Sequence, residues 1–99
     1  MTIEEIKDEK GITLLVEGKI DTLTSPEFQN AVLKSFQKAN TVVIDVKDVS
    51  YVSSAGLRAL IIGQRTAQAK GGSLSVINAS DSVKEVFRIT GFQKVLDIQ

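Results

Sequence analysis

The sequence predicts an α/β fold: a mixed, mostly parallel β-sheet that begins with an antiparallel hairpin and has helices packed on it. Two observations predict this. The first part of the chain holds two alternating segments joined by a turn-like Asp-Glu-Lys-Gly stretch, as hairpins do. From residue 24 onward, helical stretches alternate with short β-branched runs, an order that implies crossovers between parallel strands.

Length and composition limit this fold to one unit. The chain has 99 residues, of which 42% are hydrophobic and 24% are charged, ordinary values for a globular protein. That length supports one hydrophobic core but not two. No linker or internal repeat interrupts the chain, so we expect a single domain over residues 1–99.

The first strands and the first helix follow from local patterns. Residues 3–7 and 12–20 alternate as strands do, with a turn between them. Thr24 is expected to begin a helix with a hydroxyl cap, because proline follows in the first turn and Glu27 is spaced for a capping box. The apolar positions of this helix recur at helical spacing and form its buried face: Phe28, Ala31, Val32, Leu33, Phe36 and Ala39.

The middle of the chain continues the alternation. Residues 41–46 are apolar at nearly every position, as expected for a central strand covered on both faces. A second helix is predicted over residues 55–69, ending at a Gly-Gly pair that can supply a left-handed cap. Residues 73–77 form the next short strand.

The chain is expected to end with a third helix and a docked tail. Ser80 or Asp81 caps this helix, which runs through Phe87 and closes at Gly91. The tail carries apolar residues at positions 92, 95, 96 and 98. We therefore expect it to pack on the core as a last short element.

The stretch over residues 42–62 is the most informative part of the chain. A buried strand gives way to a polar loop at 48–54, which places Ser53 and Ser54 at the start of a helix. Functional crevices of parallel sheets lie outside the carboxyl ends of the strands, and a helix N-terminus favours an anion such as phosphate. Serine is also a preferred N-cap. Either serine could therefore simply start the helix, a role compatible with access by a kinase.

Composition excludes several classes of function. The chain has neither cysteine nor histidine, which removes disulfides, thiolate metal sites and a histidine base. Twelve basic and twelve acidic residues balance, so there is no basic excess for nucleic acid and no polybasic patch for a membrane surface. No apolar run reaches the length of a membrane span, and charge begins at the fourth residue. We expect a cytoplasmic protein without membrane insertion.

Catalytic interpretations fail on residue chemistry. The Ser-Ala-Gly triplet at 54–56 matches half of a nucleophile elbow, but the first glycine is missing and no histidine can activate the serine. Asp21, Asp45 and Asp48 could hold Mg²⁺ near strand ends, although aspartate more often braces loops. The lone Gly-Gly pair matches no phosphate-binding fingerprint. We therefore expect no enzyme activity, no metal and no cofactor.

Several short motifs stand in order along nearly the whole chain. They are Gly18-Lys19-Ile20-Asp21 with Thr24, the segment from Asp45 to Val52, Ser54-Ala55-Gly56-Leu57, Gly71-Gly72-Ser73-Leu74, and the later landmarks Val86-Phe87, Thr90-Gly91-Phe92 and Val95-Leu96. Together these motifs resemble the anti-sigma factor antagonist family, the free-standing STAS domains. The resemblance implies a STAS-like fold.

The resemblance also implies a regulator that is not an enzyme. In this family the unphosphorylated protein binds an anti-sigma factor, which is also a serine kinase, and so displaces a sigma factor. The kinase then phosphorylates a serine at the strand-to-helix turn, and a PP2C-type serine phosphatase removes the phosphate. ATP belongs to the kinase. The chain itself is expected to be a monomer when free.

Carried onto this sequence, the family's phosphorylated serine matches Ser54. Ser53 stands where the best-known form has aspartate, which makes it a rival phosphoacceptor. The implied partner surface comprises the loops at 21–24 and 48–54 and the start of the next helix. Its expected residues are Asp21, Thr24, Asp48, Ser50, Ser53, Ser54, Gly56, Leu57 and Arg58.

Some alternatives stay open. Arg58 stands where many relatives carry glycine, and it either tunes partner choice through a salt bridge or is a solvated helix charge. The chain could also be a STAS module of a lipid-transport complex or a stressosome-like scaffold, without a phospho-switch. A small-molecule or nucleotide-binding domain is a third class.

Overall fold

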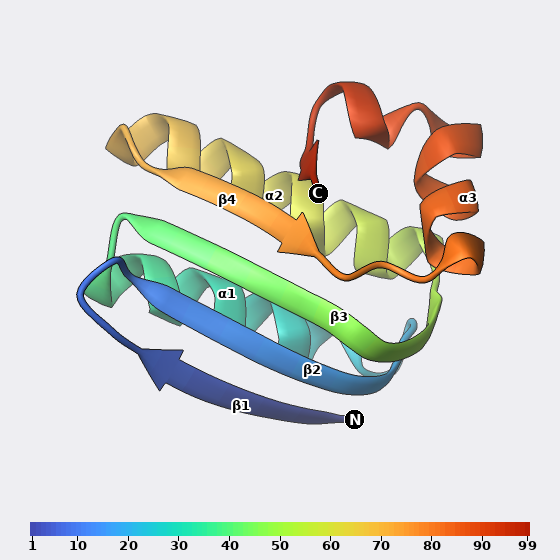
Figure 1. Ribbon diagram of the computed structural model, residues 1–99, viewed down its shortest axis with the longest axis horizontal. Coiled ribbons are helices and arrows are strands. Elements are labelled where there is room, and N and C mark those ends of the chain that lie inside the picture. Colours follow the sequence, from blue (N-terminus) through green and yellow to red (C-terminus); the bar gives the residue numbers. More distant parts are fainter.

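The computed structural model describes residues 1–99 as a five-stranded sheet with three α-helices and one 3₁₀ turn (Figure 1). The strands are β1 (Thr2–Lys7), β2 (Ile12–Ile20), β3 (Thr41–Val52), β4 (Ser73–Ile77) and β5 (Asp97–Ile98). The helical elements are α1 (Ser25–Lys38), α2 (Ser54–Lys70), α3 (Asp81–Thr90) and the 3₁₀ turn η1 (Phe92–Lys94).

The strands lie in the sheet in the order in which they occur in the chain. β1 pairs with β2 antiparallel, and every later pair is parallel. The predicted fold class is therefore confirmed. In the hairpin turn, the Asp8 carboxylate accepts from the amides of Lys10 and Gly11 at 2.8 and 3.1 Å, as expected for an aspartate-led turn.

Both long helices lie on one face of the sheet. α1 and α2 run side by side behind it in Figure 1, and between them and the sheet lies a cluster of 22 buried residues. Each right-handed crossover leads to the next strand in the same direction, so both crossover helices fall on the same side. Full burial of a side chain such as Phe28 or Phe36 contributes roughly 1.5–3 kcal/mol.

Two expectations about β3 are wrong. It is not covered on both faces, because Val42 and Ile44 are buried under the helices while Val43 and Asp45 are only half-buried on the open face. It also continues to Val52, through the segment expected to be a loop. Its pairing with β2 shifts register twice, and such bulges let a strand pass polar pairs without ending.

The start of α1 differs from the expected capping box. Thr24 precedes the helix, but neither its side chain nor that of Glu27 caps it. The Thr24 hydroxyl donates to the carbonyl oxygen of Lys19 at 2.8 Å and accepts from the amide of Asp21 at 2.9 Å. The hydroxyl therefore stabilises the preceding loop.

The other helix ends follow the sequence signals. Ser53 caps α2 and Ser80 caps α3, each accepting from the amide three residues later. Gly71 and Gly91 close these helices with φ of 71° and 75°, a conformation that favours glycine. The tail packs through Leu96, whereas Val95 is 54% exposed. No helix combines the length and apolar character needed to cross a membrane.

Candidate functional site

The carboxyl ends of β2 and β3 meet the N-termini of α1 and α2 at one edge of the sheet, on the right of Figure 1. The amide of Ser53 donates to the carbonyl oxygen of Ile20 at 2.8 Å. This bond joins Ser53, the single residue between β3 and α2, to the end of β2. The edge therefore presents the loop at 21–24 beside the junction of β3 and α2.

The two adjacent serines differ in what their hydroxyls do. Ser53 is half-buried, and its Oγ accepts from the amide of Gly56 at 3.3 Å. Ser54 is the first helical residue and is exposed, and its hydroxyl makes no hydrogen bond within the protein. Only the Ser54 hydroxyl is both free and accessible.

The start of α2 is electrostatically suited to an anion. The first intrahelical bond runs from the amide of Leu57 to the carbonyl of Ser53, so the amides of Ser54 and Ala55 precede the hydrogen-bond ladder. No acidic residue lies in the first turn. The positive end of the helix dipole is therefore not neutralised by a carboxylate of its own helix.

Two residues expected on the partner surface are buried instead. Leu57 is 3% exposed, and Gly56 is also buried. A Cβ at position 56 would lie 2.7 Å from Ile20 Cγ2 and 2.9 Å from the Ile20 carbonyl oxygen. Gly56 is thus needed for α2 to approach β2, and neither residue presents a contact surface in this structure.

The loop at Asp21 and Thr24 is held together internally. Asp21 Oδ1 accepts from the amides of Leu23 and Thr24 at 2.9 and 3.0 Å. The pKa of Asp21 is lowered, chiefly by the hydrogen bond from the Thr24 amide. Both residues therefore brace this loop, which supports the loop-bracing interpretation for Asp21.

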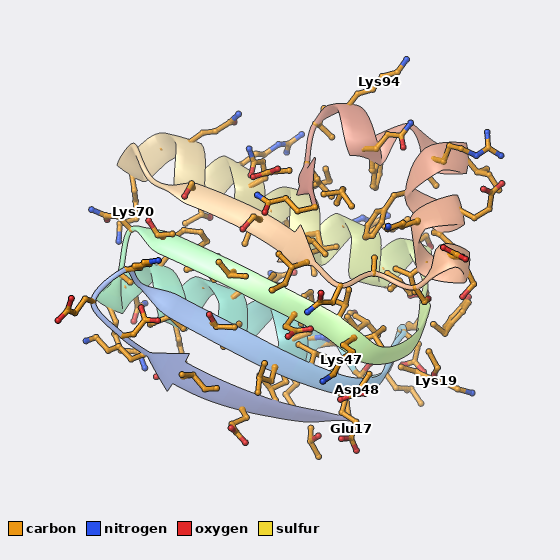
Figure 2. All side chains as sticks on the ribbon, in the orientation of Figure 1. Glu17, Lys19, Lys47, Asp48, Lys70 and Lys94 are labelled. Carbon is orange, nitrogen blue, oxygen red and sulfur yellow. The ribbon has the colours of Figure 1, made fainter.

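Asp48, Ser50 and Arg58 are exposed, as a contact surface requires. Asp48 lies on β3, opposite Glu17 of β2. Figure 2 shows Glu17, Lys19, Lys47 and Asp48 near the carboxyl ends of these two strands, so charges of both signs gather there. Arg58 follows Ser54 by one helical turn and forms no ion pair.

The three aspartates considered as metal ligands are not brought together. Asp21 is engaged in its own loop, and Asp45 Oδ1 accepts from the Lys47 amide at 3.0 Å. No group of three carboxylate, imidazole or thiol side chains in the chain is placed to hold a metal ion.

The segments 21–24 and 48–54, expected on the partner surface, also carry two exposed apolar side chains that were not singled out from the sequence. Leu23 is 90% exposed and Tyr51 is 49% exposed. Exposed aromatic and large apolar side chains next to polar groups are typical of binding surfaces. An apolar residue within a polar loop is the signal that could have singled out Leu23.

Comparison with known proteins identifies relatives over nearly the full length. The STAS domain family profile matches residues 2–99. The chain is 28% identical over 98 residues to an anti-sigma-B factor antagonist of Bacillus subtilis, covering 99% of this chain and 90% of that one. It is 30% identical over 95 residues to one from Listeria monocytogenes, covering 94% and 82%.

Solved structures share the fold. An anti-sigma factor antagonist from Mycobacterium paratuberculosis superposes with a TM-score of 0.86 at 21% identity, covering 98% of this chain and 83% of that one. SpoIIAA superposes in its unphosphorylated form with a TM-score of 0.77 at 16% identity, covering 99% and 87%. Its phosphorylated form gives 0.74 at 17% identity, covering 99% and 91%.

Proposed function

The chain belongs to the STAS domain family, and we propose that it is an anti-sigma factor antagonist switched by phosphorylation of Ser54. Unphosphorylated, it binds an anti-sigma factor that is also a serine kinase and thereby frees a sigma factor. The kinase transfers the γ-phosphoryl group of ATP to Ser54 Oγ and releases ADP, and a PP2C-type phosphatase hydrolyses the phosphoserine. The proposal places one domain, monomeric when free, in the cytoplasm.

The observation that carries this proposal is the difference between the two serines. A phosphoacceptor must be accessible to the kinase. The Ser54 hydroxyl is exposed, and its phosphorylation would break no hydrogen bond within the protein. Ser53 is half-buried and its Oγ already accepts from the amide of Gly56, so a kinase would have to disturb this N-cap, an interaction typically worth about 0.5–2 kcal/mol, in order to reach the hydroxyl. The geometry therefore favours Ser54 as the acceptor.

The relatives support a regulatory role. Curated relatives are named anti-sigma-B factor antagonists, which are regulators and not enzymes. A structural neighbour, SpoIIAA, has been solved both phosphorylated and unphosphorylated, and both forms superpose on this fold. A switch of this kind needs no catalytic group in this chain, because the kinase and the phosphatase supply the chemistry.

The switch is expected to act locally. Phosphate adds roughly 1.5 to 2 negative charges at neutral pH. At a helix N-terminus such charge is favourable to the domain by about 0.3–1 kcal/mol. In a partner interface the same charge must be desolvated or repelled, and juxtaposed like charges cost several kcal/mol. Phosphorylation should therefore release the partner without unfolding the antagonist.

The proposed partner surface surrounds Ser54. It includes Leu23 and Tyr51 as apolar anchors, with Asp48, Ser50 and Arg58 as exposed polar contacts. Asp21, Thr24 and Ser53 act on it indirectly, by holding the two loops in place. This division of roles is typical of interfaces in which a few exposed side chains carry most of the binding energy.

Incubation with the kinase and ATP tests the proposal. The protein should gain one phosphate, and fragmentation by mass spectrometry should locate it on Ser54. Ser53→Ala should still accept the phosphate, and Ser54→Ala should accept none while still binding the kinase. A Ser54→Ala protein that is fully phosphorylated on Ser53 would contradict the assignment, and a wild type that neither binds nor accepts phosphate would contradict the function.

A further inference from the structure

A groove of about 730 Å³ lies between α2 and the turn that follows α3. α2 contributes one wall and the segment from Thr90 to Val95 contributes the other. Its lining includes the apolar side chains of Ile61, Phe92 and Val95 and the basic side chains of Arg65 and Lys94, and no lining residue is acidic.

The groove is continuous with the Ser54 site along one side of α2. At 100° per residue, positions 54, 58, 61, 65 and 68 fall within an arc of about 80° around the helix axis. Arg65 lies eleven residues beyond Ser54, which is about 17 Å along the helix at 1.5 Å per residue. A partner that contacts Ser54 and Arg58 can therefore follow this side of α2 into the groove.

The charged residues on this side of α2 are both positive. They are Arg58 and Arg65, and α2 contains no aspartate or glutamate, although the chain as a whole is neutral. The two ion pairs of the protein join Lys38 to Glu5 and Arg88 to Glu85, so neither Arg65 nor Lys94 forms an ion pair. Figure 2 shows Lys94 extending from the surface into solvent.

The groove also offers apolar contacts. Ile61 and Phe92 are half-buried there, and Val95 is 54% exposed. These side chains can contact the apolar face of an occupant.

We propose that this groove docks an acidic segment of the anti-sigma factor with an apolar face, so that the partner runs from Ser54 along α2 to Lys94 on the opposite wall of the groove. The inference rests on the proposed function and adds the chemistry of the partner. Carboxylates contact Arg58, Arg65 and Lys94, and apolar side chains contact Ile61, Phe92 and Val95. A phosphate on Ser54 would then lie beside one end of the partner's acidic segment, and the like charges would repel each other.

Charge reversal tests this docking. The double variant Arg65→Glu/Lys94→Glu leaves Ser54 and its loops untouched. Binding to the serine kinase that phosphorylates Ser54 is measured without ATP, by calorimetry at two salt concentrations. We expect Kd to rise at least about tenfold in the variant. Wild-type binding should weaken with added salt, and binding by the variant should depend on salt less steeply.

The matched control is Lys10→Glu/Lys70→Glu, which changes the net charge equally. Lys70 lies about 140° around the helix from Arg65, and Lys10 lies in the hairpin turn outside the groove. Kd of this control should stay within about twofold of wild type. Amide chemical shifts of wild type on binding should change at both walls of the groove.

The outcomes separate this inference from the proposed function. If the Arg65→Glu/Lys94→Glu variant binds the kinase within about twofold of wild type while remaining folded, the acidic docking is wrong and the antagonist function stands. An equal loss in the control variant would show a general charge effect and would also overturn the docking. If wild type itself binds no serine kinase, the proposed function and this inference both fail.

Discussion

The amide of Ser53 donates a hydrogen bond to the carbonyl oxygen of Ile20 at 2.8 Å, which ties the start of α2 to the end of β2. Gly56 extends this contact, because its missing side chain leaves room for Ile20 one turn later. Ser54 therefore lies between two positions, Ser53 and Gly56, that contact Ile20 at the end of β2. The candidate phosphoacceptor belongs to this packed junction between β3 and α2.

The two serines should differ in their effect on stability. Ser53→Ala removes the side-chain cap of α2 and should lower the free energy of unfolding by about 1 kcal/mol. Ser54→Ala removes an exposed hydroxyl without a partner and should change it by less than about 0.5 kcal/mol. Urea unfolding of both variants measures the difference, and equal losses would contradict the assigned cap.

Gly56→Ala should destabilise the domain. The new methyl group would meet both the side chain and the carbonyl oxygen of Ile20, and overpacking of this kind costs about 1–3 kcal/mol. Alanine gains about 1 kcal/mol of helix propensity over glycine, so the net loss should be smaller than the clash alone. Denaturant unfolding measures the net loss, and an unchanged free energy of unfolding would contradict the close approach of α2 to Ile20.

Phosphorylation of Ser54 should leave the isolated fold intact and engage Arg58. The two residues are four apart on α2 with the anion nearer the N-terminus, the favourable orientation for a helical ion pair. We expect the melting temperature of the phosphoprotein to stay within a few degrees of wild type, or to rise slightly. Its partner affinity should fall at least about tenfold.

The variant Arg58→Ala isolates this ion pair. Any increase in melting temperature on phosphorylation should be smaller in Arg58→Ala than in Lys70→Ala, which removes a charge from the far end of the same helix. Amide exchange should change near Ser54 only. Exchange that increases throughout the sheet would show a global conformational switch instead.

Leu23 and Tyr51 should contribute to binding more than to folding. Leu23 is 90% exposed, so its truncation to alanine should change the free energy of unfolding by less than about 0.5 kcal/mol. Tyr51 is 49% exposed and lies on β3, so its truncation should cost no more than about 1 kcal/mol. At an interface, truncation of such an anchor often costs 1 kcal/mol or more, about fivefold in Kd. The affinities of Leu23→Ala and Tyr51→Ala for the kinase test this prediction. The control is Ile89→Ala, at an exposed position on α3.

Stability should be almost constant between about pH 5 and 8 and should fall in acid. The chain has no histidine to titrate in that range. The pKa of Asp21 is lowered by its hydrogen bond from Thr24, and that of Glu85 by its hydrogen bond from Arg88. A lowered folded-state pKa adds stability above the unfolded value, near 4, that is lost as pH falls through the folded value. Asp21→Asn should show a shallower acid decline in thermal melts.

Local signals in the sequence were sufficient for most of the elements. The β2 and β4 segments, the Asp8 turn and the glycine closures of α2 and α3 all depend on contacts within a few residues. The spacing of hydrophobic residues, the turn residues and the helix-capping residues all indicate such contacts directly. The order of strands and helices then predicted the sheet correctly.

Errors arose where a segment had more than one set of contacts available. Thr24 has the local pattern of an N-cap, but its hydroxyl instead donates to the Lys19 carbonyl and accepts from the Asp21 amide, two partners within five residues. The segment from Asp48 to Val52 is polar enough for a loop, but pairing with β2 keeps it a strand. The first outcome is a choice between two local contacts, and the second depends on a strand that is distant in sequence.

The sequence alone determined the fold class, the family and the pair of serines, because these depend on patterns that recur along the chain. The tertiary structure decided which serine is free, since only the packed junction shows Ser53 engaged and Ser54 exposed. It also buried Gly56 and Leu57 against the core and exposed Leu23 and Tyr51. Exposure depends on packing between segments far apart in sequence, and local patterns carry little information about it.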